Sequence, residues 1–197
     1  MKLTKKQAKA KYPNVTFIGD YFYIEKGAEI GEEVHIGEGV RIGDRAIIEA
    51  WADIDEEAEI GKEAYIESGA VIRKEAYIGD KAVIEARAEI EDRAVIRAGA
   101  YIGDEAVIRK RAFIEEGAII GAGAKGVTAC LVICGLGNTK KLTAYLCDKG
   151  LEIVIGCFTG TLEEAQKEID EKYPDEHSYN YALLLINQWA VEKLEKE

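Results

Sequence analysis

The 197-residue sequence predicts a mainly β protein, in which a solenoid of short parallel strands lies between an N-terminal helix and a small α+β module. Three observations support this prediction. Isoleucine recurs every six residues from Ile18 to Ile120, giving eighteen hexads; a small residue, usually Ala, follows almost every Ile by four positions; and the period stops at Gly126, where an Ile was due. A period of six fits neither a helix nor an ordinary strand. It fits stacked coils whose flat faces each turn one large and one small side chain inward.

Residues 17–125 are therefore expected to form the solenoid, with the isoleucines stacked in a ladder along its core. The chain has to bend between faces, and glycine tolerates the backbone conformations that tight turns require. The glycines at the expected turns are Gly27, Gly39, Gly69, Gly99, Gly117 and Gly123.

Residues 1–16 are expected to form a capping helix. Thr4 and Gln7 have the spacing of a capping box, residues 5–11 favour a helix, and Pro13 ends it. A cover is needed because the open end of a stack of strands exposes unpaired backbone groups.

Residues 126–197 are expected to form a β-hairpin followed by two helices. The segments Leu142–Cys147 and Leu151–Cys157 flank Asp148-Lys149-Gly150, which predicts a hairpin with a three-residue loop. This module is too small to be stable with certainty by itself, so we expect it to pack on the last coil or on a neighbouring subunit.

The sequence indicates where the first C-terminal helix begins and which side of the second is apolar. Thr161 and Glu164 form a second capping box, which opens a helix that runs to about Tyr173. The last helix is expected from about Tyr179 to Lys193. Its apolar side is expected to carry Ala182, Leu185, Ile186 and Trp189.

Composition excludes several classes of function. The formal net charge of −11 disfavours binding to nucleic acid or to an anionic membrane, because both need a basic surface. No apolar run approaches membrane-spanning length, and the four Cys have irregular spacing that predicts neither a disulfide framework nor a metal site. We expect a cytoplasmic protein with free thiols.

The segments EIGEEV, RIGDRA, YIGDKA and YIGDEA resemble the hexapeptide repeat of the left-handed parallel β-helix proteins, a superfamily that includes many acyltransferases. The resemblance implies three hexads per turn, hence about six coils, and a left-handed path. Members commonly form trimers with their prisms side by side. The string GCFTGTLEEA in the C-terminal module is similar to tails of uncharacterised bacterial and phage-type proteins and implies no activity.

In the acyltransferases of this superfamily a histidine acts as general base on the acceptor. His35 is the one solenoid histidine, and Asp53 follows eighteen residues later, one coil above, where a carboxylate could orient an imidazole. Acetyl-CoA would then be the acyl donor; otherwise no cofactor and no metal is expected. The alternative is an ordinary surface His beside a surface Asp. Many enzymes of this superfamily use a long loop to wall the active site, and no such loop interrupts the eighteen hexads, which favours the alternative.

Outward residues on one predicted face form an apolar stripe with one residue per coil. The stripe consists of Ile47, Tyr65, Val83, Tyr101 and Ile119. An exposed apolar line of this length is typical of an interface, so we expect a homotrimer built on the stripe. Alternatively, these residues are present because β-branched and aromatic side chains favour strands.

Three classes of function follow. The unbroken hexads favour a non-catalytic oligomeric scaffold or binding module, whose partner is a protein or a small molecule. The first alternative is a CoA-dependent acyltransferase that uses His35. The second is a protein that sequesters a small anionic metabolite or nucleotide between subunits, for which four arginines could supply charge unless they form surface salt bridges. They are Arg41, Arg73, Arg97 and Arg109.

Overall fold

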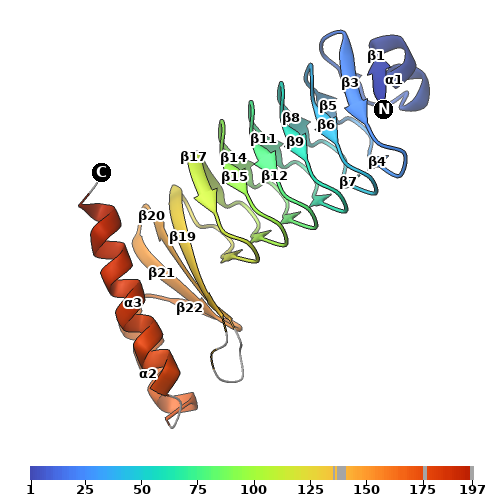
Figure 1. Ribbon diagram of the computed structural model, residues 1–197. Coiled ribbons are helices and arrows are strands. Elements are labelled where there is room, and N and C mark those ends of the chain that lie inside the picture. Colours follow the sequence, from blue (N-terminus) through green and yellow to red (C-terminus); the bar gives the residue numbers. More distant parts are fainter. Residues whose placement is uncertain (135, 137–140, 175–176, 196–197) are drawn as a thin grey trace.

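The computed structural model describes residues 1–134, 136, 141–174 and 177–195. It shows a prism of stacked coils with a short helix at its N-terminal end and a sheet with two helices at its C-terminal end (Figure 1). The N-terminal helix and the two C-terminal helices lie at opposite ends of the molecule. This confirms the predicted fold class, a parallel β-helix of about six coils with an α+β module after it.

Each coil contributes one short strand to each of three faces, and residues one coil apart pair in parallel register, as Tyr65 does with Val83. The Tyr65 face is one sheet of six strands. They are β4 (Glu29–Ile30), β7 (Ile47–Ile48), β10 (Tyr65–Ile66), β13 (Val83–Ile84), β16 (Tyr101–Ile102) and β18 (Ile119–Ile120).

The other two faces form a single sheet, because β17 (Val107–Ile114) runs across the corner between them. The His35 face contains β2 (Thr16–Phe17), β5 (His35–Ile36), β8 (Asp53–Ile54), β11 (Val71–Ile72) and β14 (Glu89–Ile90). The Tyr77 face contains β3 (Tyr21–Ile24), β6 (Arg41–Ile42), β9 (Glu59–Ile60), β12 (Tyr77–Ile78) and β15 (Val95–Ile96).

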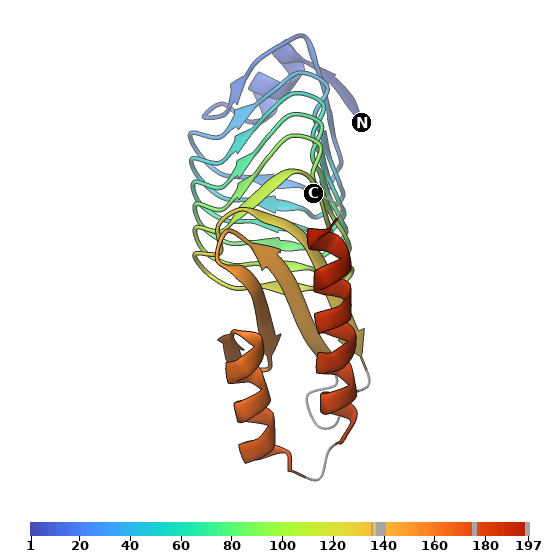
Figure 2. The same cartoon turned by 90° about the vertical axis from the view of Figure 1, so that its left-hand side faces the viewer.

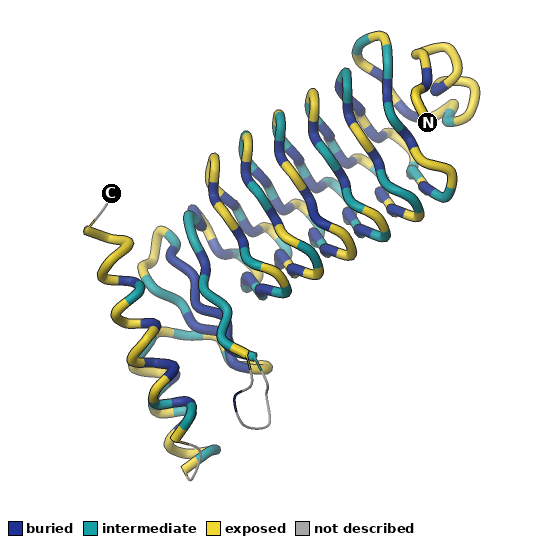
Figure 3. Tube along the Cα trace, in the orientation of Figure 1, coloured by how far each residue is buried: buried dark blue, intermediate teal, exposed yellow. Residues whose placement is uncertain are grey.

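The isoleucine ladder fills the prism as predicted. Every repeat Ile from Ile36 to Ile120 is at most 3% exposed, and the small residues that face them are buried with them. Figure 3 shows this burial along the inside of each coil, with exposed residues at the corners. Because each Ile stacks on its counterparts in the adjacent coils, the core depends on the whole stack.

The first hexad departs from the prediction. Ile18 is 56% exposed, whereas Phe17, which the six-residue pattern starting at Ile18 would place on the outside, is 3% exposed and pairs in register with the inward Ile36. The rings of Phe17 and Phe22 lie 4.8 Å apart at the open end of the ladder. Two aromatic rings cover more of this end than an Ile could, so alternation along the first strand is shifted by one residue.

From Ile30 to Ile120, the third residue after each repeat Ile lies at a corner and adopts a positive φ. Five of the predicted turn glycines have φ between 62° and 74°, whereas Gly27 is not among the residues with positive φ. Elsewhere the same place holds eleven residues other than glycine, most of them charged. The repeat therefore tolerates strained corners, because the packed strands on both sides hold the backbone.

The N-terminal cap is the predicted helix α1 (Lys5–Lys11), with both hydrogen bonds of the Thr4–Gln7 capping box present. A strand that the sequence did not indicate, β1 (Lys2–Thr4), precedes it and pairs antiparallel with β3. The antiparallel strand covers the edge that the first coil would otherwise expose.

The C-terminal module begins with β19 (Val127–Cys134), which pairs in parallel with β17 and so extends the solenoid sheet. An antiparallel meander of β20 (Lys141–Cys147), β21 (Gly150–Ile155) and β22 (Phe158–Gly160) follows. The predicted hairpin is present, but its loop has two residues instead of three. Gly150, at φ 102°, joins the ladder opposite Cys147.

The helices α2 (Leu162–Lys172) and α3 (His177–Leu194) run side by side beyond this sheet (Figure 2). The capping box of Thr161 and Glu164 is confirmed. Leu185 was expected on the buried side of α3, but it is exposed. The helix instead turns Tyr179 and Leu183 toward the sheet, next to Ala182 and Ile186. None of the helices in the described ranges is long and apolar enough to cross a membrane.

The module packs on the last coil, one of the two places predicted for it. The backbone N–H groups of Ile119 and Gly121 donate to the side-chain oxygens of Thr143 and Tyr145 on β20, at 3.2 and 3.3 Å. The side chains of β20 thus satisfy donors that a further coil would have satisfied.

Candidate functional site

The apolar stripe lies on the Tyr65 face as the sequence predicts. Its five residues are register neighbours on consecutive strands, so they form one continuous line along the sheet. Ile47 is 37% and Tyr101 36% exposed, and the side chains of Tyr65, Val83 and Ile119 are half-buried. The stripe is therefore an accessible apolar surface on a rigid backbone.

Carboxylates border the stripe along the corner that leads to the His35 face. The hydroxyl of Tyr65 donates to Glu49, and that of Tyr101 donates to Glu85. The hydrogen bond to Glu85, with burial as a further cause, raises the pKa of Tyr101 to about 12; the pKa of Tyr65 is raised in the same way. Both hydroxyls are thus satisfied within the chain, which leaves the ring faces available for packing.

A hollow of about 430 Å³ lies beside the N-terminal end of the stripe. It is lined by Ile47, Glu49, Ala50 and Ser68 among others, so it combines an apolar wall with a carboxylate. The nearby corner residue Trp51 was missed by the sequence reasoning. It is 67% exposed and has φ 61°, in a place that elsewhere holds charged residues or glycine. This departure from the repeat is the feature of the sequence that could have singled out Trp51.

The structure places His35 and Asp53 as neighbours but does not join them. They are register partners on β5 and β8, with His35 exposed and Asp53 half-buried. Within the described residues no hydrogen bond or ion pair connects the two side chains. The charge of Asp53 acts on the nearby Asp55, whose pKa is raised mainly by burial and secondly by this charge. The imidazole is thus accessible to an acceptor without being oriented by a carboxylate.

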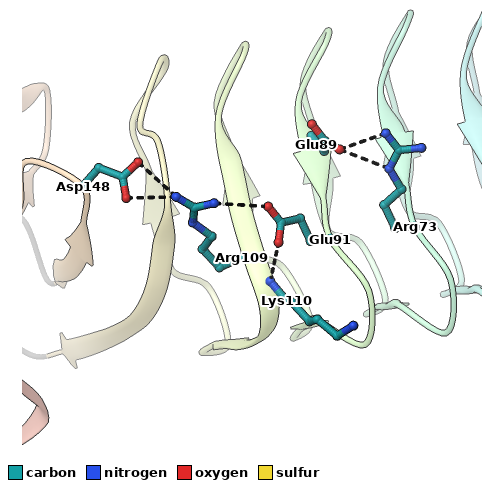
Figure 4. Close-up of polar contacts among 6 residues, drawn as sticks. All are labelled: Arg73, Glu89, Glu91, Arg109, Lys110 and Asp148. Atoms are coloured by element: carbon teal, nitrogen blue, oxygen red, sulfur yellow. Dashed lines mark hydrogen bonds and ion pairs between the residues drawn. The ribbon is translucent and has the colours of Figure 1, made fainter. Parts of the chain in front are cut away.

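The four arginines considered for anion binding all have acidic partners, in agreement with the salt-bridge alternative. Figure 4 shows two of them on the corner between the His35 and Tyr77 faces. Arg73 contacts Glu89 at 3.0 Å, and Arg109 bridges Glu91 at 3.7 Å and Asp148 at 3.3 Å. The other two pairs are Arg41 with Glu59 at 3.5 Å and Arg97 with Glu115 at 3.6 Å. These pairs oppose the binding of an added anion at the same guanidinium groups.

Two adjoining hollows at the N-terminal end of the Tyr77 face have volumes of about 320 and 250 Å³. They share Tyr23, Arg41 and Glu59, and the Arg41 guanidinium lies 5.2 Å from the centre of the Tyr23 ring. Because Arg41 is already held between a ring and a carboxylate, these hollows offer little to an anionic ligand.

Two of the four cysteines have thiols whose pKa is raised by burial. Burial raises the pKa of Cys130 to about 11, and the pKa of Cys147 is raised for the same reason, so both thiols stay neutral near pH 7. All four are free, and no group of three potential metal ligands occurs in the ranges the structure describes.

The hexads, the three-sided coils and the corner geometry define a hexapeptide-repeat β-helix protein. Comparison with protein families agrees: the family described as "GMPPB C-terminal domain" matches residues 44–143. The chain belongs to this family. The match begins in the second coil and ends within β20, so it includes most of the solenoid and the start of the cap. No curated protein matches.

Several solved structures resemble the chain at low identity. A mutant of perosamine N-acetyltransferase from Caulobacter crescentus, in complex with CoA and GDP-perosamine, is 14% identical, with a TM-score of 0.34. The match covers 61% of this chain and 60% of that chain. A UDP-N-acetylglucosamine acyltransferase from Bacteroides fragilis is 15% identical, with a TM-score of 0.38, and the match covers 66% and 60% of the two chains.

A putative acetyltransferase from Bacillus cereus is 14% identical, with a TM-score of 0.30, over 91% of this chain and 95% of that chain. This chain spans about three fifths of the length of the Caulobacter protein. At these identities the likeness bears on the fold alone. None of these names supports the phage-type similarity of the C-terminal module.

Proposed function

We propose that this chain is a self-assembling β-helix domain, a homotrimer in which three prisms meet along the stripe of Ile47, Tyr65, Val83, Tyr101 and Ile119. The observation that carries the proposal is the continuity of the stripe, with one apolar residue on every strand from β7 to β18. It extends over four coil spacings, or roughly 19 Å.

Burial of this line is favourable by roughly 25 cal/mol for each Å² of apolar surface removed from water. A closed ring lets every copy bury its stripe without leaving a sticky end, whereas an open arrangement would leave one. The carboxylates of Glu49 and Glu85 at the border already accept hydrogen bonds from the tyrosine hydroxyls of the same chain, so a neighbouring copy need not supply these donors. In this function the solenoid is a rigid scaffold and the remaining faces stay available for partners.

The test is the double variant Tyr65→Lys/Tyr101→Lys, which would place six like charges around one three-fold axis. We expect its mass by light scattering to fall about three-fold at low micromolar concentration, since buried like charges are unfavourable. Tyr77→Lys is the matched control, because Tyr77 is an exposed strand tyrosine on a different face. A monomeric wild-type protein, or a double variant that stays trimeric, contradicts the proposal.

A second candidate is acyl transfer from acetyl-CoA, which the exposed position of His35 favours. An imidazole at this place is open to an acceptor hydroxyl or amine, and Asp53 lies beside it in register. In this function His35 takes the acceptor proton as the acceptor attacks the thioester carbonyl. The C–S bond then breaks, the acyl group stays on the acceptor, and the CoA sulfur takes the proton from His35 and leaves as the thiol. Asp53 would stabilise the imidazolium that forms.

Binding and chemistry can be tested separately. The Trp189→Phe variant leaves Trp51 as the single tryptophan, and its fluorescence reports binding of acetyl-CoA, CoA or nucleotides at this corner. Thermal shifts with the same compounds give a second readout, because a ligand that binds the folded state stabilises it. His35→Ala should abolish acetyl transfer while His177→Ala leaves it intact. Wild-type protein without binding or transfer excludes this candidate, and stabilisation by nucleotides alone favours sequestration.

A further inference from the structure

The helix α3 carries a second apolar surface, on the side that faces away from the C-terminal sheet. Its members are Tyr181, Leu184, Leu185 and Val191, which are between 48% and 69% exposed. Their spacings of three, one and six residues place them on one side of an α-helix, about the position of Gln188. We call these five residues the α3 seam.

The opposite side of the same helix is buried. Tyr179, Ala182, Leu183 and Ile186 pack in the core between α3 and the sheet, and Ala190 on the same side of the helix is also buried. A helix that is apolar on both sides is normally buried on both sides. Contiguous exposed apolar residues of this size normally mark a contact with another molecule.

We propose that the α3 seam pairs with the α3 seam of a second copy of this chain, with the two helices antiparallel about a two-fold axis between Leu184 and Leu185. In this register Leu184 of each copy lies against Leu185 of the other. Tyr181 lies against Gln188, so the one polar residue of the seam faces a hydroxyl, which specifies the register as buried polar residues do in coiled coils. The pairing is self-complementary and closes at two copies.

Charge complementarity supports the antiparallel direction. The same register sets Glu192 opposite His177, at the positive N-terminal end of the partner helix, where a carboxylate is favoured. A parallel pair would instead bring the two copies of Glu192 together. The seam lacks the basic border that membrane-surface helices use, because Glu192 and Glu195 lie at its C-terminal end. A second copy of the chain therefore fits this surface better than a lipid surface does.

The α3 seam and the stripe are separate surfaces. The C-terminal sheet lies between α3 and the coils, so the seam faces away from the solenoid at the end of the molecule (Figure 1). Pairing through α3 is thus independent of contacts along the Tyr65 face. Where both contacts form, two trimers join end to end in a closed hexamer.

The experiment is the double variant Leu184→Glu/Leu185→Glu, measured by sedimentation velocity. We expect a two-fold loss of mass, against the three-fold loss expected from the stripe variant, so failure of one proposal is distinct from failure of the other. In the Tyr65→Lys/Tyr101→Lys background the seam variant should convert dimer to monomer. Leu194→Glu is the control, because Leu194 is equally exposed on α3 but lies to one side of the seam. Far-ultraviolet circular dichroism checks that each variant is folded.

A charge exchange tests the direction of pairing. Glu192→Lys should weaken the dimer roughly three- to thirty-fold, because the two-fold axis creates two equivalent contacts between this charge and a helix terminus. Adding His177→Glu should restore it, because the opposite charges again face each other. A seam variant whose mass equals that of the wild type overturns the proposal, and failure of the exchange to restore pairing overturns the antiparallel register.

Discussion

The hydroxyl of Tyr145, on β20 of the C-terminal sheet, accepts a hydrogen bond from the backbone N–H of Gly121 at the end of the last coil. It also donates to Glu152 on the neighbouring strand β21, at 2.5 Å. Burial and the contact with Glu152 raise the pKa of this phenol, which keeps it protonated and able to donate. One buried side chain therefore links the terminal coil to two strands of the cap.

Removal of this link by Tyr145→Phe is expected to lower the free energy of unfolding by about 1–3 kcal/mol, because a partly buried N–H and a partly buried carboxylate lose their partner. Urea denaturation measures the change, and hydrogen exchange should show faster exchange at the Gly121 amide. Tyr77→Phe removes the hydroxyl of an exposed tyrosine and serves as the control. Equal stabilities of the two variants would show that the Tyr145 hydroxyl does not hold the cap.

The substitution Ile72→Asp is expected to prevent folding of the whole solenoid. Ile72 is fully buried between Ile54 and Ile90, so the new carboxylate would have no polar partner within the ladder. Val71→Asp, one residue earlier on the same strand but turned outward, should fold. Expression and thermal melting distinguish the two, and a cooperatively melting Ile72→Asp protein of near-native stability would contradict the buried ladder.

The contact between Tyr101 and Glu85 makes part of the stability depend on alkaline pH. The pKa of this phenol rises from its ordinary 10.0 to about 12 in the folded protein, because Glu85 accepts its proton in a hydrogen bond. Because the pKa is higher in the folded protein, the contribution of this contact to the free energy of unfolding is complete below about pH 10 and is lost as the pH rises toward 12.

Ultraviolet titration of the wild type should therefore show a late-ionising tyrosine that moves toward pH 10 in Glu85→Gln. A Glu85→Gln variant with an unchanged titration curve would assign the late phenol to a different residue.

The strained corners predict a stabilising substitution. Lys81 has φ 57°, whereas Lys62 is not among the positive-φ residues, and both lie within 3.8 Å of Glu63. Lys81→Gly relieves a left-handed backbone and should raise the free energy of unfolding by about 0.5–1 kcal/mol. Lys62→Gly removes the same charge but relieves no left-handed backbone, so it should lower the free energy of unfolding by a similar amount. Thermal melts with the same sign of shift for both variants would contradict the backbone explanation.

The sequence by itself determined the solenoid, because its six-residue period repeats a local pattern that each coil satisfies in the same way. Ile72 could be placed in the core and Tyr101 on an outer face from spacing alone. The capping boxes at Thr4 and Thr161 were equally predictable, since their hydrogen bonds join residues three positions apart.

The tertiary structure decided what depends on contacts between distant segments. Phe17 replaces Ile18 in the core because it meets Phe22 and the end of the ladder, and Leu185 is exposed because Tyr179 and Leu183 fit the sheet better. His35 and Asp53 are register neighbours, as counting predicts, yet their side chains do not bond. A repeat determines where a backbone runs, but side-chain orientation at ends, corners and surfaces depends on neighbours that no local period contains.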